Sequence, residues 1–201
     1  MLVPGVEPGQ WARARELDGR GLSLRFAAGI HPQREGTIEA LEAFLDERGA
    51  AAIGELGWHA GVPHRDALVD AQLELARARG LPVILHVVGA QGHALGRLRR
   101  HGPLRGVVHA YSGSAELVRD YVGLGLHVSI GPSVLRPRAR RVHAACAAIP
   151  EERLLVETDA PDQSPEPADL VDVIAKVAEL RGRTVEEVGR RCADNARALF
   201  G

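Results

Sequence analysis

Hydrophobic residues recur along the chain in seven short, almost continuous runs, each followed by a longer stretch of mixed polarity. Short apolar runs without alternation are typical of parallel strands that are buried on both faces of a sheet. We therefore predict seven strands, at Leu2–Val6, Leu24–Ile30, Ala51–Leu56, Pro82–Val88, Gly106–Tyr111, His127–Ile130 and Leu154–Glu157.

The stretches between these runs have the spacing of amphipathic helices. Segment 65–79 places its apolar residues on one face and ends at Gly80, and segment 37–48 ends at Gly49. Near the C-terminus, residues 184–187 form a capping box that opens the last helix. The chain is thus an α/β protein in which strands and helices alternate.

Seven strands in this rhythm favour a TIM-type (β/α) barrel over an open doubly wound sheet, which usually has about five or six strands. No linker or change in composition divides the chain, so we predict a single domain over residues 1–201. A complete barrel has eight strands and about 250 residues. Because Met1 leads almost directly into the first run, we expect the first strand to be the missing one, encoded in frame upstream.

Composition and charge narrow the class of protein. Hydrophobic residues make up 45% and charged residues 25% of the chain, which are ordinary values for a globular protein. We find no apolar run long enough to span a membrane and no signal peptide, and we expect a cytoplasmic protein. The net charge is −1, so any nucleic acid would have to be held by a local basic patch. Cys192 falls on the apolar stripe of the last helix and is expected to be a core residue.

Four of the predicted strands end in side chains that bind metals. They are Glu55, His86, His109 and Asp159. Each has an ordinary alternative on its own: a capping carboxylate, a core histidine or the start of a turn. Their shared position favours metal binding over these alternatives, because barrel strands bring their carboxyl ends to one rim, where active sites lie. Two histidines and two carboxylates there suit a divalent cation.

The order and spacing of several motifs resemble the TatD family of metal-dependent hydrolases, almost end to end. The motifs are Gly29-Ile30-His31-Pro32, Ile53-Gly54-Glu55-Leu56-Gly57, Gln72-Leu73-Glu74-Leu75-Ala76, Leu81-Pro82-Val83-Ile84-Leu85-His86, His109-Ala110-Tyr111-Ser112-Gly113-Ser114, Leu155-Val156-Glu157-Thr158-Asp159-Ala160-Pro161 and Asn195-Ala196-Arg197-Ala198-Leu199-Phe200-Gly201. The resemblance implies a distorted TIM barrel that hydrolyses phosphodiester bonds, as a deoxyribonuclease does.

The same resemblance implies roles for the strand-end residues. Glu55 would bridge two cations, and His86 and His109 would hold the more enclosed one. Asp159 would ligate a metal and would orient or deprotonate the attacking water. The implied cofactor is Mg²⁺, Mn²⁺ or Zn²⁺, one or two per chain, and the implied substrate is nucleic acid, with no obligate protein partner.

The chain also departs from the family pattern. No His-x-His pair precedes Glu55, and the segment 87–89 replaces a polar pair that usually follows the ligand histidine. His59 and Asp162 stand where the family usually has an aspartate and an aromatic residue. These departures leave two alternatives open: a degenerate barrel that only binds metal, or a hydrolase of another ester or amide bond.

Other residues are weaker candidates. For substrate binding they are His31, Ser112, Arg136 and Arg138. His31 is equally suited to a structural hydrogen bond, and the basic segment 136–141 is slightly better suited to the solvated start of a helix than to binding a nucleic-acid backbone. Two loop histidines, His59 and His64, are candidates to replace a missing ligand.

Overall fold

The computed structural model describes residues 1–14, 16–17, 21 and 23–201. It divides into two compact units. The first comprises Met1–Arg97 with Leu104–Gly106 and Phe200, and the second comprises Leu98–Pro103, Val107–Leu199 and Gly201. The single domain expected from the sequence stays a prediction.

The first unit is built on four parallel strands that follow one another in chain order. They are β1 (Leu2–Gly5), β2 (Arg25–Ala28), β3 (Ala52–His59) and β4 (Val83–Val88). All four coincide with predicted runs. In β3 every residue except His59 is buried, and in β4 every residue except His86 and Val88, as expected of strands covered on both faces. Strands β1 and β2 are less buried.

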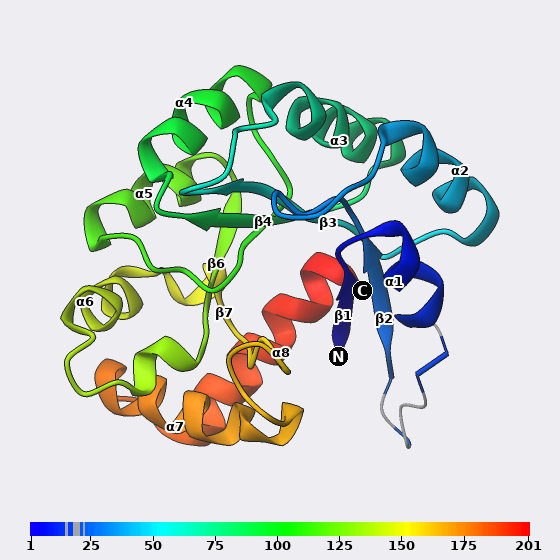
Figure 1. Cartoon of the computed structure of the whole chain (residues 1–201). Coiled ribbons are helices and arrows are strands. Elements are labelled where there is room, and N and C mark those ends of the chain that lie inside the picture. Colours follow the sequence, from blue (N-terminus) through cyan, green and yellow to red (C-terminus); the bar gives the residue numbers. More distant parts are fainter. Residues whose placement is uncertain (15, 18–20, 22) are drawn as a thin grey trace. The chain divides into compact units, whose positions relative to one another are not determined.

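Helices follow the strands of the first unit. They are α1 (Pro8–Ala14), α2 (Ile38–Arg48), α3 (Asp66–Arg79) and α4 (Gln91–His101), whose last four residues belong to the second unit. The chain leaves α2 at Gly49 and α3 at Gly80, as predicted. Helices α2 and α3 lie side by side, and α3 packs along β3 (Figure 1).

Helix α1 was not predicted from the sequence. Its Trp11 is 3% exposed, donates a hydrogen bond from Nε1 to the Gly29 carbonyl at 2.9 Å, and packs against the Phe44 ring. This burial stabilises a helix of only two turns that would not form alone.

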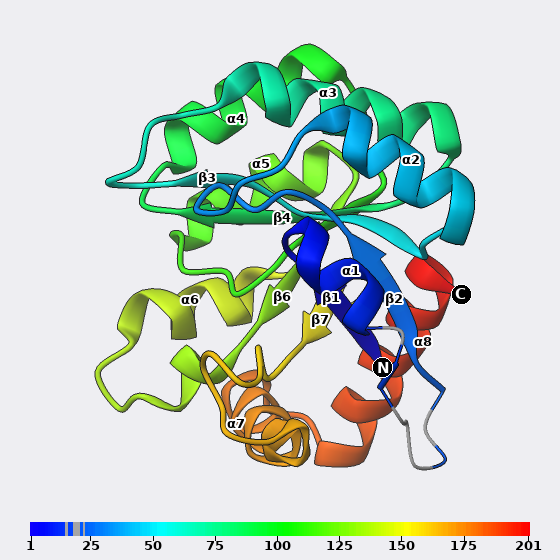
Figure 2. The same ribbon diagram turned by 45° about the vertical axis from the view of Figure 1, so that its right-hand side comes forward.

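The second unit contains the other three strands: β5 (Gly106–Val108, whose first residue belongs to the first unit), β6 (Leu126–Ile130) and β7 (Leu154–Val156). Strands β6 and β7 are parallel, with Val128 opposite Leu154. The helices are α5 (Ala115–Gly123), α6 (Arg140–Ala148), α7 (Leu170–Arg181) and α8 (Val185–Phe200). Short 3₁₀ turns lie at Pro132–Leu135 (η1), Glu151–Arg153 (η2) and Pro167–Asp169 (η3). Helices α6 and α7 pack together, and α7 also contacts β7 (Figure 2).

Helix α8 begins as predicted, with the Thr184 hydroxyl accepting the Glu187 N–H and the Glu187 carboxylate accepting the Thr184 N–H. Cys192 is buried in the core, and its burial raises its pKa to about 12. Val185, at the first helical turn, is 49% exposed and does not share this burial. Asn195 donates to the Glu151 and Leu154 carbonyls, both at 2.8 Å, and so fastens α8 to the start of β7.

Among the described residues, no helix is both long enough and apolar enough to pass through a lipid bilayer.

Candidate metal centre

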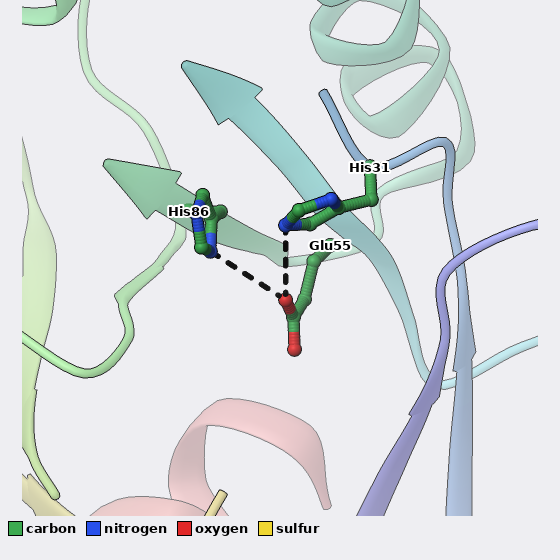
Figure 3. Close-up of side chains that lie close together, drawn as sticks. All are labelled: His31, Glu55 and His86. Atoms are coloured by element: carbon green, nitrogen blue, oxygen red, sulfur yellow. Dashed lines mark ion pairs between the residues drawn. The ribbon is translucent and has the colours of Figure 1, made fainter. Parts of the chain in front are cut away.

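Two imidazole rings and one carboxylate meet in the first unit. Glu55 lies on β3, His86 lies on β4, and His31 lies in the segment after β2. The Glu55 Oε2 atom is 4.0 Å from His31 Nε2 and 3.8 Å from His86 Nδ1. Figure 3 shows both rings facing this oxygen from different segments of the chain. The structure therefore brings together two of the expected ligands and adds His31, which the sequence suggested only for substrate binding.

Glu55 sits at an irregularity of the sheet. In the register of β3 and β4, Gly54 pairs with Ile84 and Leu56 pairs with Leu85, so Glu55 is an extra residue between them. Such a bulge bends a strand and redirects the side chain that it carries. The position of the Glu55 carboxylate thus depends on the bulge as well as on the strand.

Gly57 holds β3 close to His86. The two residues are paired in register, and a Cβ atom on Gly57 would lie 2.2 Å from the His86 carbonyl oxygen. Its φ of +141° is also one that residues with side chains rarely adopt. Glycine at this position therefore allows the close approach that places His86 beside Glu55.

The cluster is shielded from solvent. His31 is 8% exposed and Glu55 is 7% exposed. A buried carboxylate requires hydrogen-bond donors or a cation. The two neighbouring imidazoles can donate N–H groups, or they can offer lone pairs to a metal ion that neutralises the carboxylate. A set of one oxygen and two nitrogen ligands suits Zn²⁺ or Mn²⁺.

His59, the last residue of β3, contacts the far side of His86. His59 Nδ1 and His86 Nε2 are 2.9 Å apart, and which of the two donates depends on the tautomers. His86 thus presents Nδ1 to Glu55 and Nε2 to His59. The sequence suggested His59 as a replacement for a missing ligand. In the structure it lies beside His86, which is itself a candidate ligand.

In the second unit, His109 follows β5 and contacts Glu157, which follows β7. His109 Nδ1 is 3.3 Å from Glu157 Oε1, and the Ala110 N–H donates to the same oxygen at 2.6 Å. Burial alone would raise the pKa of this carboxyl, but hydrogen bonds and the charge of His109 hold the pKa below its ordinary value. An ionised Glu157 favours the tautomer of His109 that carries its proton on Nδ1, which leaves Nε2 as a possible ligand.

Asp159 lies in the second unit too, two residues after Glu157. Its φ is +52°, in the left-handed region that aspartate tolerates better than most residues. Its Oδ2 atom accepts a hydrogen bond from Gln163 Nε2 at 2.6 Å, and its backbone carbonyl accepts one from the Gln163 N–H at 2.9 Å. The turn after β7 therefore holds this carboxylate through both its side chain and its backbone.

The remaining candidates lie at the surface. Ser112, Arg136 and Arg138 are exposed, and Arg140 and Arg141 begin α6. His64 is exposed as well, and it lies near Asp66 and His93 and outside the cluster of Glu55.

The sequence did not indicate Glu157 as part of a site, although it precedes Asp159 in the same motif. The available signal was its position as the last residue of an apolar run, the kind of position that singled out the other candidates.

The whole chain, residues 1–201, matches the family model described as TatD related DNase. The chain is 32% identical to the uncharacterized metal-dependent hydrolase YjjV of Escherichia coli K12. The alignment covers 100% of this chain and 85% of that protein. The chain is 34% identical to the 3'-5' ssDNA/RNA exonuclease TatD of Erwinia billingiae, over 100% of this chain and 87% of that protein.

Solved structures agree with these sequence relationships. The crystal structure of the E. coli YjjV TatD homologue superposes with a TM-score of 0.88 over 99% of this chain and 85% of that chain, at 32% identity. A TatD family hydrolase from Entamoeba histolytica gives a TM-score of 0.85 at 16% identity, covering 99% of this chain and 83% of that chain, which concerns the fold alone. The likeness confirms the predicted fold class, a TIM-type β/α barrel with seven recognisable strands.

The family model spans every residue, and relatives such as YjjV are named as metal-dependent hydrolases. The chain accordingly belongs to the TatD related DNase family of metal-dependent hydrolases.

Proposed function

We propose that this protein hydrolyses phosphodiester bonds of nucleic acid at a site that holds one or two divalent cations. The observation that carries the proposal is the buried Glu55 carboxylate, whose Oε2 atom faces His31 and His86. Relatives named as ssDNA/RNA exonucleases support nucleic acid as the substrate class.

The donor atoms fit a transition-metal ion. Bonds from zinc to nitrogen or oxygen are about 2.0–2.2 Å long, so two atoms that share one ion lie less than about 4.4 Å apart. The separations of 4.0 and 3.8 Å around Glu55 Oε2 satisfy this limit. The histidine content favours Zn²⁺ or Mn²⁺ over Mg²⁺.

Glu55, His86, His109 and Asp159 are the proposed ligands, and His31 joins them through its position beside Glu55. A bound divalent cation would lower the pKa of water and stabilise negative charge on the phosphate oxygens. No serine or cysteine nucleophile is required for such a reaction.

The chain's own residues would position the reacting groups. Gln163 holds the Asp159 carboxylate, which would orient the attacking water and accept its proton. Glu157 would keep the His109 ring in one orientation. Both are contacts within the second unit, and they fix the acid–base group and the imidazole before any substrate binds.

Substrate recognition would rely on exposed residues of the second unit. Arg136 and Arg138 lie on an exposed segment, and Ser112 is exposed after β5. With a net charge of −1, the protein would bind nucleic acid through such a local patch. We propose that these side chains contact the phosphate backbone.

The test is an exonuclease assay on end-labelled single-stranded DNA, with duplex DNA and RNA in parallel, in Mg²⁺, Mn²⁺ or Zn²⁺. We expect cleavage that EDTA abolishes and that the metal restores. The variant Glu55→Gln, purified in the same way, controls for contaminating nucleases and should lose nearly all activity. Equal cleavage by Glu55→Gln and wild type would contradict the proposal, as would metal-bound protein that cleaves none of the three substrates.

A further inference from the structure

The first unit carries a second group of metal-binding side chains, apart from the cluster of Glu55. His64 lies in the loop between β3 and α3, Asp66 is the first residue of α3, and His93 lies on α4. One ligand atom from each lies within 4.8 Å of the others. We infer that these three residues form a further binding site for a transition-metal ion, with Zn²⁺ as the preferred occupant.

The three side chains already face one another. Asp66 Oδ1 and His93 Nε2 are 2.8 Å apart, and the ring centroids of His64 and His93 are 4.3 Å apart with an interplanar angle of 40°. Ligand atoms around one tetrahedral zinc ion are separated by about 3.3 Å. The Asp66–His93 separation is shorter than this value, and all three ligand atoms lie within 4.8 Å of one another, so small rotations of these side chains suffice to admit an ion.

The composition of the group is that of an open zinc site. Two imidazoles and one carboxylate provide three ligands, and a tetrahedral ion takes a fourth from water. His93 is 36% exposed and Asp66 is 30% exposed, so an ion can reach the site from solvent. A simple hydrogen bond between Asp66 and His93 would not require His64, and this second imidazole ring distinguishes the group from an ordinary ion pair.

Neighbouring residues hold the carboxylate in place. Trp58, fully buried on β3, donates a hydrogen bond from Nε1 to Asp66 Oδ1 at 2.8 Å. Its ring also meets the His93 ring edge to face, at 5.9 Å between centroids. Hydrogen bonds of this kind orient metal ligands, and their loss typically weakens binding by about 10- to 100-fold.

A nearby cation does not fill the site. Arg97 Nε is 3.8 Å from Asp66 Oδ2, on the other carboxylate oxygen from the one that faces His93. The Arg97 guanidinium also pairs with Asp70 through its NH2 group. Asp66 therefore presents Oδ1 to His93 while Oδ2 faces the arginine.

An ion bound here would link three segments of the first unit: the loop at His64, the start of α3 and the first turn of α4. The loop begins directly after His59, which contacts His86. The site would therefore serve as a structural cross-link beside the Glu55 cluster.

The test is zinc stoichiometry, measured by equilibrium dialysis with elemental analysis of the full chain. We expect His64→Ala and His93→Ala each to bind one zinc ion fewer per chain than wild type. The same difference of one ion should persist when each change is introduced into a Glu55→Gln/His86→Ala protein. This comparison separates the inference from the proposed hydrolase site. His101→Ala, on the same helix and outside the group, should bind as much zinc as wild type.

A second measurement concerns the orienting residue. Trp58→Phe keeps an aromatic ring but removes the N–H group, and it should weaken zinc binding at this site by about 10- to 100-fold. Circular dichroism would confirm that each variant is folded. Unchanged zinc stoichiometry in both histidine variants would overturn the inference, and so would unchanged affinity in a folded Trp58→Phe protein.

Discussion

In the second unit, one proposed ligand and the residue directly after another have backbone angles in the left-handed region. They are Ala110, with φ of +45°, and Asp159, with φ of +52°. Alanine gains nothing from this conformation, but here its N–H group donates to the Glu157 carboxylate, which also contacts His109. Strained backbone of this kind persists where surrounding contacts impose it, and it is common at functional sites.

The change Asp159→Asn tests the residue that we propose as the acid–base group. Asparagine tolerates the left-handed region as well as aspartate does, so the turn after β7 should keep its structure. The substitution removes the negative charge and the ability to accept a proton. We expect kcat to fall by about 10²- to 10⁴-fold, with an unchanged circular dichroism spectrum.

The matched control is Asp162→Asn, which removes one negative charge from an exposed position in the same turn. It should retain wild-type kcat. If Asp159→Asn turned over substrate as fast as this control, Asp159 would have no part in the chemical step.

At the scale of elements, β3 contributes to both groups of side chains in the first unit. It carries Glu55 at its bulge, Trp58 beneath Asp66, and His59 beside His86. The strand is buried over almost its whole length. Its pairing with β4 therefore determines where several functional side chains lie.

Gly57→Ala tests this dependence. The new Cβ atom would overlap the His86 carbonyl oxygen, and alanine is strained at φ of +141°. We expect a loss of about 2–4 kcal/mol in the free energy of unfolding, measured by urea denaturation. Metal binding through His86 should weaken in the same variant.

Gly96→Ala is the control, because Gly96 lies on α4 with no atom within 4 Å of a Cβ placed there. Alanine favours helices, so this variant should gain about 0.4–1 kcal/mol. A Gly57→Ala protein as stable as Gly96→Ala would show that β3 can move away from β4 without cost.

The hydrophobic pattern predicted the strands well because most of them, β3 to β7, are largely buried, which leaves continuous apolar runs in the sequence. It missed α1, whose stability depends on Trp11 reaching Gly29 and Phe44 in the folded chain. It also located Glu55 and His86 on their strands. His31 lies beside Glu55, and Glu157 lies beside His109, because of a bulge in β3 and the paths of the loops. The spacing of residues along the sequence does not predict these features.

At the scale of the whole molecule, metal binding is expected to contribute to folding. The proposed ligands come from segments far apart in the sequence, and such a site does not exist in the unfolded chain. Binding free energy at the site is therefore added to the stability of the folded protein.

Removal of metal should accordingly lower the melting temperature. An ion present at about 100 times its Kd stabilises the folded state by about 2.7 kcal/mol. For a chain of this length, that corresponds to a shift of about 5–10 °C. Differential scanning calorimetry with EDTA, and then with saturating Zn²⁺ or Mn²⁺, measures it. A melting temperature that does not respond to either treatment would contradict metal binding by the folded protein.

Helix α3 touches both groups of side chains in the first unit. Its first residue, Asp66, belongs to the group with His64 and His93. Further along, the fully buried Gln72 accepts a hydrogen bond from the Ile30 N–H at 2.8 Å and donates one to the Ile30 carbonyl at 3.3 Å, directly before His31. At a rise of 1.5 Å per residue, the two residues are about 9 Å apart along one rigid axis. Any ion that displaces α3 would shift the backbone at Ile30 with it. Occupancy of the two groups would then be thermodynamically linked, and each ion would change the affinity for the other by the same factor.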